Sequence, residues 1–220
     1  MLEEGTEMKN GKKLLVLSLV LLIMIGTCTF FLRNLLFGDV AGTYEQAVAD
    51  RDQYKEVWVS YEVVACLGNY AEGSEYYGFI PTGHEYHYLV WMEDGSFMPL
   101  SVSKKADREY LDSLTNATYD YLEKKTSKIE VEPRTFTGTV KNLETKIKGF
   151  YSNALSKMNI KVTEDHKVYY DLMDCTSSRT SYCLLVGGVM LIPIFGFVFA
   201  FSSIVKEKRR PKGEEIYLPK

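Results

Sequence analysis

The sequence predicts two transmembrane helices that flank one α+β domain, built from an antiparallel sheet with about two packed helices. Two runs of residues, 14–32 and 183–205, contain no charged side chain. Strand-like and helix-like patterns fill residues 38–180 between them, and basic residues gather beside the outer end of each run. These observations give an order of cytoplasmic N-terminus (1–13), first span (14–37), domain (38–180), second span (181–205) and basic cytoplasmic tail (206–220).

Both uncharged runs are long enough to cross a bilayer. They contain 19 and 23 residues, and a helix rising about 1.5 Å per residue needs about 20 residues for a hydrocarbon core about 30 Å thick. Three lysines before the first run resemble the charged start of a signal peptide, but the apolar part of a signal peptide is only about 7 to 15 residues long. We therefore interpret the first run as an uncleaved signal anchor.

The distribution of basic residues predicts the orientation, because Lys and Arg near a span are retained in the cytoplasm. Eight flank the outer ends of the two runs and three, Arg33, Lys167 and Arg179, flank the inner ends. We expect an integral protein of the plasma membrane with both termini cytoplasmic. The eight are Lys9, Lys12, Lys13, Lys206, Lys208, Arg209, Arg210 and Lys212.

The charge of the predicted exterior domain argues against nucleic acid as a partner. Residues 38–180 contain 16 Lys and Arg against 23 Asp and Glu, a net charge of −7, whereas nucleic acid binding needs a basic surface. The expected partners are the lipid bilayer and a protein or cell-envelope component. The tail from residue 206, with six basic and three acidic residues, holds the topology and could also contact anionic lipid.

The first half of the domain shows strand patterns. A short helix is expected over 42–55, and alternating apolar residues predict a strand over 57–67. Residues 68–85, rich in Gly and Tyr, suggest a long loop or an irregular hairpin. Strands at 86–92 and 97–102 are expected to pair through a type I′ turn at Asp94-Gly95. Pro99 lacks an amide donor and favours a sheet edge for the second of them.

The second half alternates helices and strands. Ser103 is expected to cap a helix that extends to about residue 125, and a second helix is expected over 142–158. A strand is expected at 135–140 and one or two more at 160–163 and 168–172. This order predicts helices packed on a sheet.

Two cysteines in the domain leave two alternatives open. Cys66 and Cys175 could form a disulfide outside the cell if their Cα atoms lie within about 7 Å, or they could be two separate buried thiols. Cys28 and Cys183 lie within or beside the spans, where a thiol behaves as a small apolar group.

The sequence contains little that identifies a reaction. It has no phosphate-binding Gly-rich loop, GxSxG, HExxH or paired CxxC, and we assign no catalytic, cofactor or metal residue and no cofactor. His84, Glu85 and His87 could in principle be metal ligands, but on a strand only Glu85 and His87 share a face. A solvated hairpin is the favoured interpretation. Catalysis is therefore less favoured than binding, although an enzyme with an unrecognised site stays open.

Tyrosine is unusually frequent in the domain, which holds 14 of the 16 in the chain. Tyrosine supplies large amphipathic contact area at recognition surfaces, and long loops in compact domains are usually functional or disordered. We therefore expect a partner-contact surface on the segment between residues 70 and 88. Its candidate residues are Tyr70, Tyr76, Tyr77, Tyr86 and Tyr88.

The spans offer a packing surface rather than an ion path. Gly196 and Ala200 form a small-xxx-small pair that permits close helix approach, and neither span has an ionisable residue in its interior. This argues against an ion path within one chain, although a subunit of a channel or transporter complex stays a third hypothesis.

The two spans, the Asp94-Gly95 hairpin and Thr137-Gly138-Thr139-Val140 ahead of a helix together resemble uncharacterised bacterial two-span membrane proteins with an α+β extracytoplasmic domain. The resemblance implies an architecture and no activity. The leading hypothesis is a membrane-anchored extracytoplasmic module for binding, sensing or an accessory role.

Overall fold

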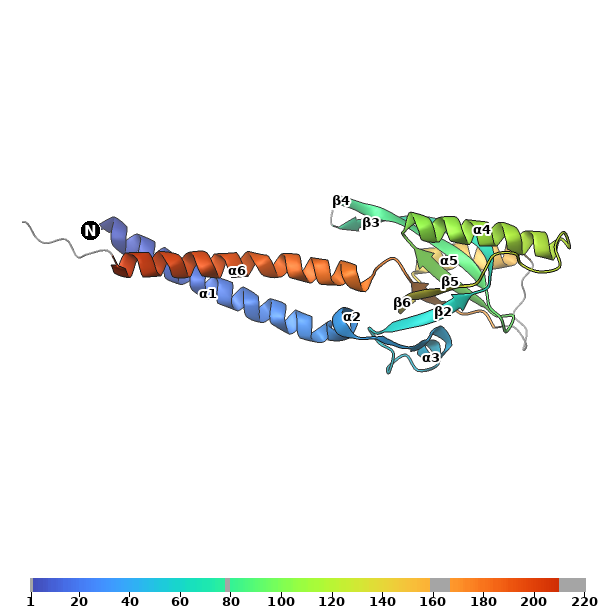
Figure 1. The fold of residues 1–220 in the computed structure, drawn as a ribbon, viewed down its shortest axis with the longest axis horizontal. Helices are drawn as coiled ribbons and strands as arrows, with labels where there is room; N and C mark the ends of the chain where they lie inside the picture. The colour runs from blue at the N-terminus through green and yellow to red at the C-terminus, as the bar shows by residue number, and fades with distance from the viewer. Residues whose placement is uncertain (1, 78–79, 159–166, 210–220) are drawn as a thin grey trace, which may run out of the picture. The chain divides into compact units, whose positions relative to one another are not determined.

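The computed structural model describes residues 2–77, 80–158 and 167–209. The chain divides into two compact units, one made of the terminal segments and the other of Asn34–Arg179. The second unit is a mixed seven-stranded sheet with helices (Figure 1). The prediction of a sheet combined with helices between two apolar helices is confirmed.

The terminal unit contains α1 (Leu2–Phe31) and α6 (Arg179–Arg209). Within them, Lys12–Phe31 and Arg179–Lys206 are long and apolar enough to cross a membrane. Their apolar side chains are largely exposed, which is the opposite of what a core helix of a water-soluble protein requires. Length, composition and exposure therefore all agree with a pair of spans.

The strand order in the sheet is β1-β2-β6-β7-β5-β4-β3. The strands are β1 (Val40–Thr43), β2 (Trp58–Val63), β3 (Ala65–Tyr77), β4 (Ile80–Trp91), β5 (Phe97–Val102), β6 (Arg134–Asn142) and β7 (Asp171–Asp174). Two pairs are parallel, β1 with β2 and β5 with β7. The prediction of a wholly antiparallel sheet is therefore wrong, because these two pairs join segments whose register no local turn determines.

Helices cover both faces of the sheet. α4 (Lys105–Leu122) packs on one face, and Leu111 and Leu114 join its core with Tyr88, Val90 and Leu100. α5 (Thr145–Lys157) packs on the other, and its Tyr151 and Leu155 join Leu89. Because strand side chains alternate, neighbouring residues such as Tyr88 and Leu89 serve opposite faces. We call these the α4 face and the α5 face.

The glycine- and tyrosine-rich segment from residue 68 is a hairpin. β3 and β4 pair from Ala65–Trp91 to Tyr77–Ile80, with three irregularities in register. The interpretation as a long loop is wrong and the alternative of an irregular hairpin is confirmed, because bulges such as that at Gly68, with φ of +113°, accommodate the glycines. The expected single strand over 57–67 instead breaks after Val63 into β2 and β3.

The β4–β5 turn forms where predicted but has a different type. Gly95 has φ of +83°, and its amide donates to the Met92 carbonyl. Asp94 is not among the described residues with positive φ, so the turn is not type I′. The Asp94 carboxylate accepts from the amide and hydroxyl of Ser96, which stabilises this alternative.

Pro99 lies in an interior strand, because β5 stands between β7 and β4. Its lack of an amide donor is accommodated by a gap in the pairing with the β7 segment. Phe97 bridges Val168 and pairing resumes only at Leu100 with Met173. The predicted edge position is therefore wrong.

The remaining elements lie close to their predicted places. Within 42–55, expected as one short helix, the chain forms the end of β1, then α3 (Tyr44–Ala49), which Thr43 caps, and turns from residue 51. α2 (Arg33–Phe37) precedes them. The residue before α4 is Lys104 rather than Ser103, whose hydroxyl donates to the Thr176 carbonyl. The strand expected at 160–163 lies outside the described residues.

Candidate functional site

A cavity of about 630 Å³ opens on the α5 face of the sheet. We call it the α5 cleft. Residues of β3, β4, β6, β7 and α5 line it, so its walls come from segments far apart in the sequence. The residues used below are Glu72, Gly73, Glu85, His87, Lys141, Leu143, Glu144, Lys146, Ile147, Phe150, Leu172 and Asp174.

Three buried polar residues lie in register across the sheet beside this cleft. His87 of β4 pairs with Ser101 of β5, and Ser101 pairs with Asp174 of β7. Their exposed fractions are 2%, 0% and 4%. We call these three residues the polar row. Buried polar groups need hydrogen-bond partners, because an unpaired one keeps its full desolvation cost.

Asp174 is the well-partnered end of the polar row. Its carboxylate accepts hydrogen bonds from Ser101 Oγ at 3.3 Å, from the Thr176 amide at 2.9 Å and from Lys141 Nζ. Burial opposes ionisation of Asp174, but the hydrogen bonds from Lys141 and Thr176 outweigh it and hold its pKa below the usual range. This end of the row therefore carries a compensated negative charge.

His87 is the poorly partnered end. Burial lowers the pKa of His87 to about 4, against a weaker opposite effect of the Asp174 carboxylate, so the imidazole is neutral at pH 7. Its Nε2 lies 3.7 Å from Oε1 of Glu85, beyond normal hydrogen-bond length. Its buried Nδ1 has no hydrogen-bond partner among the described residues. A buried group in this condition is unusual and calls for a partner that the described residues do not supply, such as a water molecule or a bound group.

Aromatic rings pack behind His87. The Tyr70 ring centroid lies 5.9 Å from that of His87 and 5.2 Å from that of Tyr151. The buried hydroxyls of Tyr70 and Tyr151 also lack partners within the described part of the chain. Burial raises the pKa of both phenols, so both are neutral. Three unpaired polar atoms thus occur in one set of adjacent rings.

Charged and apolar side chains both line the cleft, and α5 with its N-cap residue Glu144 contributes some of each kind. Glu72, Glu85 and Glu144 contribute carboxylates, and Lys146 contributes an ammonium group. α5 presents Ile147 and Phe150, and the Phe150 side chain is 45% exposed. An exposed phenyl ring facing a polar cleft suits an amphipathic ligand.

The polar row does not have the geometry of a serine hydrolase. In that arrangement the histidine lies between the nucleophilic serine and the carboxylate. Here Ser101 lies between His87 and Asp174 in the strand register and donates directly to Asp174. Ser101 is also fully buried. The arrangement suits recognition of a bound group better than nucleophilic attack.

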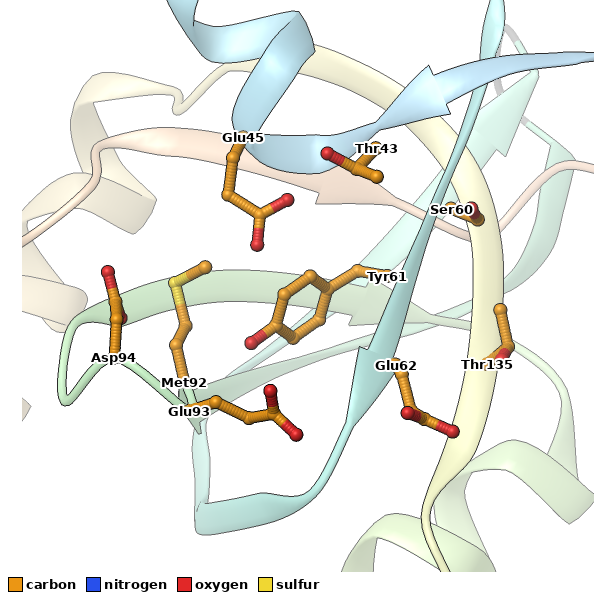
Figure 2. Close-up of a pocket in the computed structure, with 9 residues that line it drawn as sticks. All are labelled: Thr43, Glu45, Ser60, Tyr61, Glu62, Met92, Glu93, Asp94 and Thr135. Carbon is orange, nitrogen blue, oxygen red and sulfur yellow. The ribbon is translucent and has the colours of Figure 1, made fainter.

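A second cavity, of about 600 Å³, lies where α3, β2 and the β4–β5 turn meet (Figure 2). Figure 2 shows Glu45 and Glu93 approaching the Tyr61 ring from two sides, with Glu62 and Asp94 also on the wall. All four carboxylates are exposed to solvent, and the Tyr61 hydroxyl is hydrogen-bonded to the Glu93 backbone. The described His, Cys, Asp and Glu side chains form no group able to hold a metal ion. We therefore regard this acidic pocket as a solvated surface.

The structure separates the tyrosines proposed as partner contacts. Tyr88 is fully buried and donates to Asp112 at 2.6 Å, so in this conformation it cannot contribute to a contact surface. Tyr86 is partly buried, accepts a hydrogen bond from Arg108 and lies under its guanidinium. Tyr70 faces His87, while Tyr76 and Tyr77 lie in β3 with side chains outside the described set.

The segment between residues 70 and 88 also contains two residues that the sequence analysis placed on one face of a strand. Glu85 and His87 both line the α5 cleft. Ser101, Asp174 and Lys141 were missed, because only the pairing of β4 with β5, β5 with β7 and β6 with β7 brings them there. The available signal was Ser101, the one polar residue in the otherwise apolar sequence of β5.

The cysteines of the domain are free thiols. Cys66 and Cys175 are both buried in the core on the α4 face, without a disulfide. Burial raises the pKa of Cys66 to about 11, and burial also raises that of Cys175 well above the usual value. Of the two alternatives, the structure contains the pair of buried thiols.

The two apolar helices meet at small residues. A Cβ added to Gly196 of α6 would lie 2.7 Å from Oγ of Ser18 on α1. Ser18 is 2% exposed, and Ala200, one turn beyond Gly196, is fully buried. Gly196 thus lies where the helices approach closely, an arrangement that suits helix pairs in lipid.

Comparison with known families assigns the chain. A family model described as "Domain of unknown function (DUF8577)" matches residues 2–206. The chain belongs to the DUF8577 family. The match includes both apolar helices and the whole domain, so these parts belong to one family unit. No curated protein and no solved structure matches the chain.

Proposed function

We propose that this chain is an integral membrane protein whose domain, Asn34–Arg179, lies outside the cytoplasm and binds a ligand in the α5 cleft. The observation that carries the binding proposal is His87, which is 2% exposed, lines the cleft and has an unpartnered ring nitrogen among the described residues. Perturbed buried groups in a cleft are a recognised mark of functional sites.

The membrane part of the proposal has independent support. Two helices are long and apolar enough to span a membrane. Eight basic residues flank their outer ends against three at the inner ends, which favours cytoplasmic termini. We place the protein in the plasma membrane, with its N-terminal helix as a signal anchor.

Binding is favoured over catalysis by the chemistry of the polar row. A general base needs a pKa near the working pH, whereas His87 titrates near pH 4. The buried Ser101 hydroxyl already donates a hydrogen bond to the Asp174 carboxylate. Such a row can position a ligand by hydrogen bonding without taking part in covalent chemistry.

Orientation is tested with single cysteines in a background that lacks the four native ones. Ser113→Cys lies on the exposed surface of α4, and Glu214→Cys lies in the tail. On intact cells an impermeant maleimide should label Ser113→Cys and leave Glu214→Cys unlabelled until the membrane is opened. The reverse pattern would overturn the orientation.

Ligand binding is tested by native mass spectrometry of the full chain purified in mild detergent. Gly73→Phe should fill the cleft, since a Cβ at Gly73 meets no atom closer than 3.9 Å. Wild type and the matched control Ser113→Phe, on the opposite side of the sheet, should retain a co-purifying mass that Gly73→Phe loses. Equal spectra for all three would argue that the cleft holds no ligand.

A further inference from the structure

The polar atoms buried beside the α5 cleft indicate a class of ligand. We propose that this cleft recognises an uncharged pyranose sugar, with a sugar hydroxyl bonded to His87 and the apolar face of the sugar ring stacked on Phe150. This inference rests on the proposed function. It concerns the chemistry of the ligand, which the binding proposal leaves open.

Three buried polar atoms beside the cleft have no hydrogen-bond partner among the described residues. They are Nδ1 of His87 and the hydroxyl oxygens of Tyr70 and Tyr151. Their rings are adjacent, with centroids 5.9 Å apart for Tyr70 and His87 and 5.2 Å apart for Tyr70 and Tyr151. His87 lines the cleft, so a ligand reaches this group of rings through the imidazole. A bound hydrogen-bonding group would restore an interaction that burial has removed.

The buried end of the cleft suits an uncharged ligand group. Burial lowers the pKa of His87 to about 4 and raises the pKa of Tyr70 and of Tyr151, so all three rings are neutral at pH 7. A charged group placed among them would lose its water and gain no opposite charge from these rings. A hydroxyl both donates and accepts hydrogen bonds, and it therefore suits a neutral imidazole in either tautomer.

Short polar side chains elsewhere on the wall fit a ligand with several hydroxyls. Ser74 and Ser177 contribute hydroxyls, and Glu72 and Glu144 contribute carboxylates. Hydroxyl and carboxylate oxygens accept hydrogen bonds from sugar hydroxyls. These residues come from β3, from the start of α5 and from the chain after β7, so they can meet hydroxyls that point in different directions from one ring.

The exposed ring of Phe150 fits the apolar face of a sugar. Phe150 is 45% exposed, and Ile147, about one turn away on α5, lines the cleft beside it. The face of a phenyl ring is electronegative, and the C–H groups of a pyranose face are weakly positive. The volume of about 630 Å³ lies within the range of about 300 to 1,000 Å³ found for small-molecule sites.

Small sugars test the ligand class. The full chain in lipid nanodiscs, labelled with ¹³C-histidine, has three labelled imidazoles, those of His84, His87 and His166, and His87→Leu identifies the His87 signal. The probes are the methyl glycosides of glucose, galactose, mannose and N-acetylglucosamine. At least one should shift the His87 signal saturably. The 2-amino and uronic acid derivatives of that sugar should bind about tenfold more weakly or not at all, because their charges would have to be desolvated.

Variants of Phe150 test the stacked ring. Phe150→Ala should raise the Kd of the sugar about tenfold, because it removes both the apolar contact and the aromatic face. Phe150→Tyr keeps the ring and should keep the Kd. Phe150→Leu keeps an apolar side chain without a ring, and it replaces Phe150→Ala if the alanine variant alters the His87 signal of the free protein. The control Tyr121→Ala removes a ring on α4 that is 40% exposed, and it should leave the Kd unchanged.

The outcomes separate the inference from the proposed function. The sugar is overturned if none of the four glycosides shifts His87, if a charged derivative binds at least as tightly, or if Phe150→Ala and Phe150→Leu both keep the Kd. It is also overturned if Gly73→Phe, which fills the cleft, still binds the sugar. If the sugar fails while Gly73→Phe loses the co-purifying mass, the cleft remains a binding site for another class of ligand. If the mass spectra of Gly73→Phe and wild type are also equal, both proposals are overturned.

Discussion

The two faces of the sheet are built differently, although a helix packs on each. The α4 face has a closed core that includes Tyr88, Val90, Met98, Leu100 and Val102 from β4 and β5. On the α5 face the same strands contribute the buried polar residues His87 and Ser101 beside the apolar Leu89 and Phe97. A sheet covered by helices usually has apolar side chains on both faces, so the α5 face departs from the pattern that stability alone would select.

The difference separates residues that hold the fold from residues that serve the cleft. Replacing a buried ion pair, or both partners of a buried hydrogen bond, by apolar groups of similar shape is often neutral or stabilising. We infer that the α4 face provides most of the stability of the domain and that the α5 face retains polar groups for binding. Adjacent positions on one strand allow a direct test.

The largest loss of stability is expected for Leu100→Ala. Ser101→Ala, at the next residue, is the matched variant on the α5 face. Leu100 is fully buried on the α4 face, and its truncation should destabilise the domain by about 2 to 5 kcal/mol. Ser101→Ala removes one hydrogen bond from Asp174, which keeps others, and should cost about 1 kcal/mol or less. Urea unfolding followed by the fluorescence of Trp58 and Trp91, the two tryptophans of the chain, measures both. Similar losses of stability in the two variants would contradict the inferred difference between the α4 face and the α5 face.

His87 should make stability depend on pH. The unfolded imidazole binds a proton near pH 6.5, and the folded one only near pH 4, so the unfolded state binds more protons between these values. Stability should therefore fall as the pH is lowered from about 6.5 to about 4, by up to about 3 kcal/mol.

His87→Leu should remove this dependence of stability on pH. The control His84→Gln replaces an exposed neighbour and should keep the dependence. The pKa of Asp174 lies below its usual range, so the stability that Asp174 contributes is lost mainly at lower pH. An unchanged slope in His87→Leu would show that another group causes it.

Gly138→Ala tests how closely β6 and β7 must approach. A Cβ at Gly138 would lie 2.4 Å from the Asp174 carbonyl oxygen and 2.8 Å from Cys175 Sγ. Since the backbone of β7 would have to move, we expect Gly138→Ala to lower the free energy of unfolding by about 1 to 3 kcal/mol. Gly73→Ala meets nothing closer than 3.9 Å and should be neutral or stabilising by up to about 1 kcal/mol. Comparable urea midpoints for the two variants would argue that β7 can shift freely.

Local patterns in the sequence predicted the elements that local physics determines. The apolar stripes of α4 and α5 and the Asp94-Gly95 turn were found because their signals lie within one or two turns of chain. The extension of β3 and β4 through residues 68–85 was not recognised as regular strand. There the tertiary pairing of two long strands overrides the weak strand propensity of glycine.

Only part of the site could be predicted from the sequence, because the rest of it also depends on tertiary strand pairing. Glu85 and His87 are two residues apart, so strand alternation placed them on one face. Ser101, Asp174 and Lys141 join them through the register of three further strands, one of which pairs in parallel. A parallel pair has no hairpin turn to fix its register, and a sequence pattern cannot supply it.

The smallest expected effect concerns the two thiols on the α4 face, where reduction should change nothing. Cys66 and Cys175 are buried and free, and their raised pKa values keep the reactive thiolate scarce. A disulfide between them would close a loop of about 110 residues and would stabilise the domain by about 4 to 5 kcal/mol in the chain-entropy model. We expect equal urea midpoints with and without reductant, and two alkylated thiols per domain after unfolding in iodoacetamide. A midpoint that falls on reduction, together with two thiols protected from alkylation, would show that the α4 face is cross-linked and that its stability does not come from packing alone.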